Sequence, residues 1–194
     1  INTNTLNVID RYDLIIDATD NFQTRYMLND ACVLLNKPLV YGAIYQYEGQ
    51  VAVFNLATRD GRSTNYRNLF PQPPEINEVP DCNTTGVLGV LPGMIGIMMA
   101  SEAIKVLTNY TTPLINKMLL FSLKNTSFYE MDIPSITENA DGAENIGEFL
   151  ATDYSLLCGG ELTITWDAAL EIINRDLKNN LLLDVRTFDE QPRL

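Results

Sequence analysis

The feature that most restricts the fold is a short apolar run that ends in an acidic turn and leads directly into a helix. Residues 14–16 read Leu-Ile-Ile before Asp17, a pattern typical of a buried strand in a parallel sheet. Asp20 or Asn21 then caps a helix predicted over residues 22–35. A strand followed at once by a capped helix predicts an α/β fold.

The rest of the first 133 residues also predicts a series of strands and helices. A segment without clear periodicity, residues 58–85, interrupts it, and such a stretch in a compact domain is usually functional or mobile. An apolar helix opened by Pro92-Gly93 is expected to be mostly buried. The predicted elements are strands over 39–44 and 50–54 joined by a turn at 47–49, a helix over 94–107, and a hairpin with strands over 117–123 and 127–133.

The composition changes near residue 134. Residues 134–160 are polar, acidic and weakly patterned, which predicts a linker. A new unit is expected over residues 161–194, with a strand over 162–164, a helix from Trp166 to Leu177 and a buried strand over 181–184. Only ten residues follow the predicted strand over 181–184, and we expect this unit to be too short to build its own core. The predicted parts are therefore 1–133, 134–160 and 161–194.

Charge and residue usage exclude several classes of function. The net charge is −12, and no basic patch is visible, so a nucleic-acid partner is not expected. The chain has no histidine, which excludes Ser-His-Asp and Cys-His catalysis and histidine-bearing metal sites. Three widely spaced cysteines indicate a reducing cytoplasm. No run of 18 or more apolar residues appears, so no membrane span is expected.

Four elements in order over residues 8–133 resemble the MoeB/ThiF family, which shares its fold with the ubiquitin-activating enzymes. They are DATDNFQTR from Asp17 to Arg25 with Asn29 one turn on, PLVYGA over 38–43, EGQ over 48–50, and the run from Gly86 through Pro92 and Gly96 to EAIK over 102–105. In the tail, Thr165-Trp166 and LLDVR over 182–186 resemble the first strands of a rhodanese domain.

The resemblance implies a partial Rossmann-like α/β domain, with a mixed, largely parallel sheet, that forms the C-terminal part of an adenylation domain. It implies ATP-dependent adenylation of the C-terminal glycine of a ubiquitin-like sulfur carrier such as MoaD or ThiS, for molybdopterin or thiamine synthesis or tRNA thiolation. A carrier ending in Gly-Gly and a homodimer are the implied partners. The family's glycine-rich phosphate loop is not found before Asp20, so the chain alone is not expected to bind ATP well. The alternative is a carrier-binding module without catalysis.

By the same resemblance, Asp20 is a magnesium-binding aspartate beside the ATP phosphates, and Asn21 contacts the nucleotide. A carboxylate suits a hard cation that neutralises leaving pyrophosphate. The alternative for Asp20 is a helix cap. Arg25 either faces phosphate or makes a structural salt bridge.

The cysteines have different predicted roles. Cys82 matches the family's transfer cysteine and is interpreted as a nucleophile, with a plain loop cysteine as the alternative. Cys32 lies on an apolar helix and is expected to be core packing. The two Cys-x-x-Cys pairs that bind zinc in the family fall on residues 65–68 and 155–158, where only Cys158 is a cysteine, so zinc is not expected.

Overall fold

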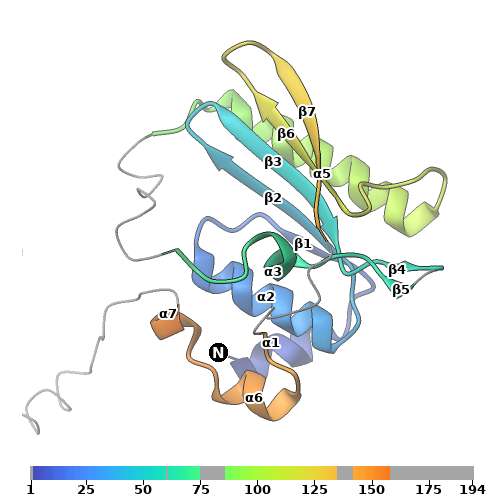
Figure 1. Cartoon of the computed structure of the whole chain (residues 1–194), viewed down its shortest axis with the longest axis vertical. Coiled ribbons are helices and arrows are strands. Elements are labelled where there is room, and N and C mark those ends of the chain that lie inside the picture. The colour runs from blue at the N-terminus through green and yellow to red at the C-terminus, as the bar shows by residue number, and fades with distance from the viewer. Residues whose placement is uncertain (1, 60, 75–85, 135–141, 158–194) are drawn as a thin grey trace, which may run out of the picture. The chain divides into compact units, whose positions relative to one another are not determined.

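A computed structural model describes residues 2–59, 61–74, 86–134 and 142–157. The chain divides into two compact units, residues 1–160 and 161–194, and all the described residues belong to the first. Its elements are α1 (Asn2–Ile9), β1 (Ile15–Asp17), α2 (Phe22–Leu34), β2 (Leu39–Tyr45), β3 (Glu48–Phe54), β4 (Ala57–Thr58), β5 (Gly61–Arg62), α3 (Tyr66–Leu69), α5 (Val90–Thr108), β6 (Lys117–Ser122), β7 (Ser127–Asp132), α6 (Ile146–Ala151) and α7 (Tyr154–Leu157) (Figure 1).

The centre of this unit is a five-stranded sheet in the order β1-β2-β3-β6-β7. β1 runs parallel to β2, while β2–β3, β3–β6 and β6–β7 are antiparallel pairs. The mixed α/β fold is thus confirmed. The expectation of a largely parallel sheet is wrong for the described strands, because short turns join β2 to β3 and β6 to β7 and such turns force antiparallel pairing.

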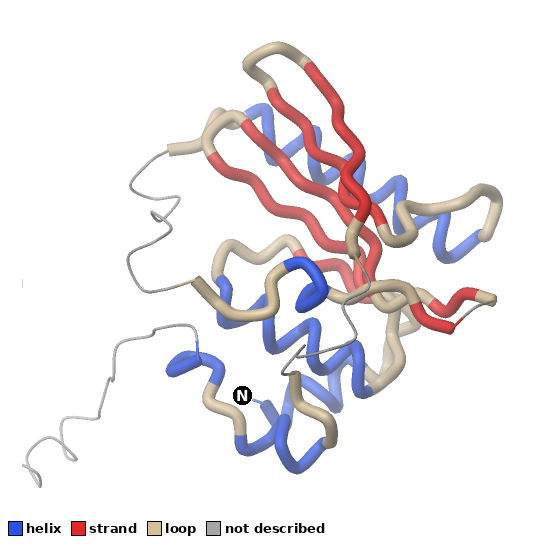
Figure 2. Tube along the Cα trace, viewed as in Figure 1, coloured by secondary structure: helices blue, strands red, loops and turns tan. Residues whose placement is uncertain are grey.

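Helices cover both faces of the sheet (Figure 2). On one face α2 and the helices around it share a core with Leu39, Tyr41 and Phe54. On the other face α5 packs against Val40 and Val53. Successive residues of a strand point to opposite faces, so the alternation along β2 and β3 divides the apolar side chains into two separate cores.

Two glycines let α5 approach the sheet closely. A Cβ atom added at Gly42 on β2 would lie 2.1 Å from the Sδ of Met99, and one at Gly49 on β3 would lie 2.2 Å from the Cδ1 of Ile95. A side chain at either position would therefore require the Met99 or Ile95 side chain to move. The glycines of the PLVYGA and EGQ motifs are explained by this contact.

The prediction that the apolar helix is mostly buried is wrong. α5 begins at Val90 and buries one face, while Ile97 is 73% exposed and Ile104 is 54% exposed. By length and composition α5 could also cross a membrane. Helices that cover a sheet pass the same test, and α5 packs on β2 and β3.

The linker predicted over 134–160 is wrong for residues 142–157, which form α6 and α7 and belong to the first unit. Phe149 and Tyr154 are buried in the core around α2. The Asn2 Nδ2 atom donates hydrogen bonds to the carbonyl oxygens of Phe149 (3.0 Å) and Thr152 (2.7 Å). Residues 142–157, called the returning segment below, are thus bound to α1 as well as to α2.

The segment predicted to lack structure also contains short elements. Its described part holds the β4–β5 hairpin and the one-turn helix α3. Residues 75–85, with Cys82, and residues 161–194, the tail expected to be rhodanese-like, lie outside the described residues.

Candidate functional site

The loop after β1 is fixed by a buried aspartate. Asp17, only 1% exposed, accepts hydrogen bonds at Oδ1 from the backbone N of Thr19 (2.9 Å) and from its hydroxyl (2.7 Å). This turn delivers Asp20 to the surface at the carboxyl end of a parallel strand, where open α/β sheets bind ligands. Asp17 was not among the predicted site residues, although its position at a strand end before a turn is a signal that sequence contains.

Asn21, and not Asp20, caps α2. The Asn21 Oδ1 atom accepts a 2.8 Å hydrogen bond from the backbone N of Thr24, which is the usual capping geometry. Its Nδ2 atom lies 3.4 Å from the Asp20 Oδ1, a long contact. Asp20 therefore does not cap the helix, which was the alternative to its predicted role. Its exposed carboxylate is available to bind a cation.

Arg25 binds backbone rather than an acid. Its Nη2 and Nε atoms donate to the carbonyl oxygen of Thr19 at 2.9 and 3.3 Å. The guanidinium carbon lies 5.6 Å from the ring centroids of both Phe22 and Tyr41. Among the described residues the ion pairs do not include Arg25, so the predicted salt bridge is not formed there. Arg25 braces the loop that carries Asp20.

Tyr41 and Tyr66 lie beneath this loop, and neither was predicted. Both are buried, with ring centroids 5.3 Å apart. Burial raises the pKa of each hydroxyl, and the positive charge of Arg25 opposes that rise. Both hydroxyls therefore stay neutral at physiological pH.

Cys32 is a core residue, as predicted. It is fully buried, and burial, with a smaller contribution from Asp17, raises the pKa of its thiol to about 12 against the lowering effect of Lys37. A protonated thiol is neither a nucleophile nor a metal ligand. Cys82 and Cys158 lie outside the described residues.

This shift predicts the labelling behaviour of Cys32. Because the thiol stays protonated below its raised pKa, iodoacetamide at pH 8.5 is expected to leave Cys32 unmodified in the folded chain and to modify it in denaturant. Peptide mass spectrometry checks both states. Rapid modification of Cys32 in the native chain would contradict its burial.

Residues 65 and 68, on which the first of the family's zinc pairs falls, make other interactions. Asn65 and Asn68 form a capping box at α3: the Asn65 Oδ1 accepts from the backbone N of Arg67 (2.8 Å), and the Asn68 Oδ1 accepts from the backbone N of Asn65 (2.7 Å). In the described part of the chain no group of three or more His, Cys, Asp or Glu residues is arranged to hold a metal. The expectation of no zinc stays a prediction.

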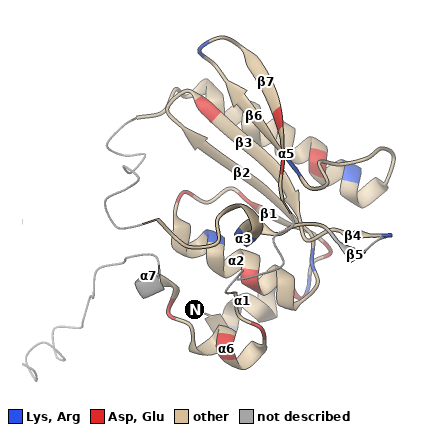
Figure 3. Cartoon of the chain, viewed as in Figure 1, with Lys and Arg blue, Asp and Glu red and all other residues tan. Residues whose placement is uncertain are grey.

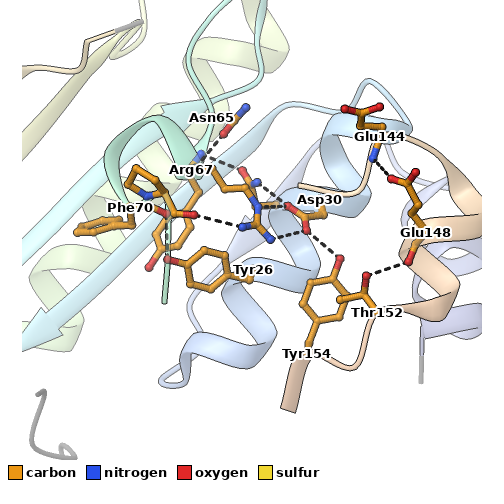
Figure 4. A network of polar contacts seen from close by, with 12 residues as sticks. Tyr26, Asp30, Asn65, Arg67, Phe70, Glu144, Glu148, Thr152 and Tyr154 are labelled. Carbon is orange, nitrogen blue, oxygen red and sulfur yellow. Dashed lines mark hydrogen bonds and ion pairs between the residues drawn. The ribbon is translucent and has the colours of Figure 1, made fainter. Parts of the chain in front are cut away.

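A buried polar network joins α2, α3 and α7 in this region (Figure 4). Arg67 donates from Nε and Nη2 to the two carboxylate oxygens of Asp30, both at 2.8 Å, and the Tyr154 hydroxyl donates to Asp30 Oδ2 at 2.8 Å. Burial lowers the pKa of Arg67, but Asp30 outweighs burial and raises it. Residues from three elements far apart in sequence are thus fastened together.

A cavity of about 360 Å³ lies beside this network, and its lining includes Asn29, Asp30, Arg67 and residues 142–144. Asp20, Asn21 and Arg25, the predicted site residues that the structure describes, do not line it. Asp20, Asn21 and Arg25 are instead brought together at the N-terminus of α2.

Comparison with known proteins identifies the family. A model described as the ThiF family matches residues 1–141. The sulfur carrier protein adenylyltransferase of Thermus thermophilus is 45% identical over 157 residues, which cover 80% of this chain and 58% of that protein. The probable adenylyltransferase/sulfurtransferase MoeZ of Mycobacterium tuberculosis is 41% identical over 145 residues, 72% of this chain and 37% of that protein.

A third relative extends the match into the tail. The adenylyltransferase and sulfurtransferase MOCS3 of Anopheles gambiae is 38% identical over 203 aligned residues, 96% of this chain and 45% of that protein. The chain spans between 37% and 58% of the length of these three relatives.

Solved structures share the fold at low identity. A crystal structure of Escherichia coli MccB with ATP has a TM-score of 0.56 at 15% identity, over 72% of this chain and 42% of that one. A second MccB structure, with MccA-N7isoASN, has a TM-score of 0.58 at 15% identity. The fold, the family model over residues 1–141 and the ordered motifs agree, and this chain belongs to the ThiF family.

Proposed function

We propose that this chain is part of an enzyme that uses ATP to adenylate the C-terminal carboxylate of a sulfur carrier protein. The names of its relatives support this reaction. The observation that carries the proposal is the exposed Asp20 carboxylate at the end of β1, held by the Asp17–Thr19 turn and relieved of helix capping by Asn21.

In this reaction a carboxylate oxygen of the carrier attacks the α-phosphorus of ATP. A carbon-bound oxygen–phosphorus bond forms, the bond from the α-phosphorus to the bridging oxygen breaks, and pyrophosphate leaves. The carrier supplies the nucleophile, so the protein supplies position and charge. This division of labour needs no catalytic histidine, which agrees with a chain that contains none.

The residues at the N-terminus of α2 fit a magnesium nucleotide. Magnesium is usually held by one or two carboxylates together with substrate phosphates, and Asp20 offers one exposed carboxylate. The ion, when bound, neutralises charge on the leaving pyrophosphate. In the described part of the chain, the donors beside Asp20 include the Asn21 Nδ2 atom, in long contact with Asp20, and the N–H groups of Arg25 that do not bond to Thr19.

The phosphate-binding loop belongs, in this proposal, to the part of the relatives that the chain does not match. The chain alone is then inactive, and activity tests use a full-length parent that includes that part. The alternative, a carrier-binding module without catalysis, predicts carrier binding with no transfer of AMP.

Detection of AMP on the carrier separates these two functions. A carrier that ends in Gly-Gly, incubated with the full-length parent and magnesium-ATP, is expected to gain one AMP by intact-mass spectrometry. A carrier that lacks its last glycine is the matched control and is expected to stay unmodified. Carrier that binds in a pull-down but never gains AMP supports the binding module instead.

We assign to Cys82 a step after adenylation, on the carbonyl carbon of the acyl-adenylate. Either the Cys82 thiolate attacks and forms a thioester, or the outer sulfur of a persulfide, placed on Cys82 by a sulfane-sulfur donor, attacks and forms a reducible acyl disulfide. In both cases the carbon–oxygen bond to the phosphate breaks and AMP leaves. Cys82→Ser is then expected to leave pyrophosphate exchange within about threefold of wild type, a change below roughly 0.7 kcal/mol, and to abolish any reducible adduct with the carrier. If exchange falls together with the adduct, Cys82 belongs to the adenylation site. If both survive, it is a loop cysteine.

The remaining features of the proposal follow from the same resemblance. The tail over 161–194 is the start of a rhodanese-like sulfurtransferase domain, and the protein acts in the cytoplasm. The product serves molybdopterin synthesis, thiamine synthesis or tRNA thiolation.

A homodimer is supported by the exposed face of α5. Between Val90 and Thr108 the charged residues are Glu102 and Lys105, and Figure 3 shows how little of this helix is charged. Small and apolar exposed residues recur every three or four positions, and such a stripe permits close helix packing. The stripe consists of Gly93, Gly96, Ile97, Ala100 and Ile104.

Ile97→Asp is expected to dissociate this dimer, because a charge would be buried in an apolar helix contact. Analytical ultracentrifugation of the variant should show a monomer. Tyr129→Asp, at a 64% exposed position on β7, is the control and should stay dimeric. A wild-type monomer, or a dimer that survives Ile97→Asp, would remove α5 as the interface.

A further inference from the structure

The brace between Arg25 and the Asp20 loop depends on an aromatic ring that no motif assigns to the site. Arg25 holds the carbonyl oxygen of Thr19 with two N–H groups, while Asp17 holds the N–H of the same residue. Thr19 is therefore fixed on both sides, directly before Asp20. Thr19 therefore fixes the backbone on the N-terminal side of Asp20, and the Asn21 cap fixes it on the other side.

The Arg25 guanidinium lies over two rings at 5.6 Å, that of Phe22, its neighbour on α2, and that of Tyr41 from the sheet. Tyr41 lies on β2 directly opposite Asp17 on β1, and its ring centroid is 5.6 Å from the Arg25 guanidinium carbon. A guanidinium over an aromatic face is attracted to the ring quadrupole while its in-plane donors stay available. The ring thus restricts Arg25 without using the hydrogen bonds that hold Thr19.

The Tyr41 ring is itself immobilised from behind. Its centroid lies 5.7 Å from that of Phe54 and 5.3 Å from that of Tyr66, and all three side chains are at most 2% exposed. Tyr66 is fixed at the start of α3, where its backbone N donates to Asn29 Oδ1 at 2.8 Å. Asn29 belongs to α2, the helix that also carries Arg25. The Tyr66 ring that packs on Tyr41 is therefore anchored to the same helix as Arg25.

We propose that Tyr41 is a positioning residue of the adenylation site, acting on Asp20 through Arg25 and Thr19. This inference rests on the proposed function for its effect on activity. Its structural part, the restraint of Arg25 by the ring, holds or fails independently of that function. The alternative is that the Tyr41 ring only fills the core. In that case its removal would affect Asp20 no more than the removal of any other core side chain.

A double-mutant cycle in the full-length parent tests the activity part. Tyr41→Leu is expected to raise the magnesium concentration for half-maximal pyrophosphate exchange by about fivefold, the scale of one cation–π contact, while Tyr41→Phe stays within about twofold. In an Arg25→Ala background, Tyr41→Leu is expected to add less than about twofold, because residues that act through one another are not additive. An equal effect in both backgrounds, or none in either, would overturn the proposal.

Nuclear magnetic resonance of this 194-residue chain tests the structural part without activity. The Arg25 Nε–Hε signal is expected to be protected from exchange by its bond to Thr19 and shifted by the nearby rings. Tyr41→Leu should lose the shift and the protection, and Tyr41→Phe should keep both. In the full-length parent, Arg25→Lys, which spares the core, should raise the magnesium concentration for half-maximal exchange as Tyr41→Leu does. An unprotected Arg25 signal in wild type overturns the brace, whereas absence of exchange activity in wild type overturns only the proposed function.

Discussion

Asp30→Ala is expected to lower the free energy of unfolding by about 3–5 kcal/mol, since it leaves a buried guanidinium without its partner. The side chains of Arg67 and Asp30 are only 4% and 2% exposed. Asp30 also accepts hydrogen bonds from Tyr154 and from Asn29, so one substitution removes the common acceptor of the network. Urea denaturation followed by circular dichroism measures the change.

The matched control is the exposed ion pair between Lys117 and Glu130, at 2.9 Å on neighbouring strands. Glu130→Ala is expected to leave the denaturation midpoint unchanged, because water replaces the lost partner. A double change of Asp30 and Arg67 to leucine and methionine should recover much of the loss, because no charge is then left buried. If Asp30→Ala is as mild as Glu130→Ala, the network does not fasten the returning segment.

Asp20→Ala is expected to reduce pyrophosphate exchange by the full-length parent at least about tenfold, or roughly 1.4 kcal/mol or more of transition-state stabilisation. The reason is the loss of the one exposed carboxylate in the turn that Asp17 and Thr19 hold. The stability of the Asp20→Ala variant should differ little from that of the wild type, because Asn21 supplies the cap of α2. Exchange at several magnesium concentrations, with thermal unfolding alongside, measures both effects.

Asp13→Ala is the matched control for Asp20. Asp13 is an exposed aspartate just before β1, at the end of the strand opposite to the proposed site, and it carries the same charge. Its removal should leave exchange unchanged. Equal losses from Asp13 and Asp20 would indicate a general charge effect, and no loss from Asp20 would remove it from the magnesium site.

The strands and the long helices were predictable because their patterns are local. The run at 14–16, the largely apolar runs over 39–44 and 50–54, and the turn at 124–126 each lie within a few residues and give β1, β2, β3, β6 and β7 near their observed bounds. The extent of burial was less predictable. Ile16 is 50% exposed because β1 is the edge strand of the described sheet, and an apolar run does not show which strand lies at an edge.

The returning segment could not be predicted because its stabilising contacts are long-range. α6 and α7 have six and four residues, too few for a visible helical period. Their contacts run from Asn2 to Thr152 and from Asp30 to Tyr154. For the site, sequence placed Asp20, Asn21 and Arg25 on one turn of the chain. It could not show that Arg25 binds Thr19 or that Tyr41 and Tyr66 lie beneath it, since these depend on the packing of β2 and α3.

The most direct test of the proposed reaction is isotope exchange between pyrophosphate and ATP, with the full-length parent and a panel of small carrier proteins. The account predicts exchange only when a carrier with a C-terminal Gly-Gly is present, and its loss when the last glycine is removed. Robust exchange without any carrier, or no exchange with every ubiquitin-like carrier tried, would contradict it.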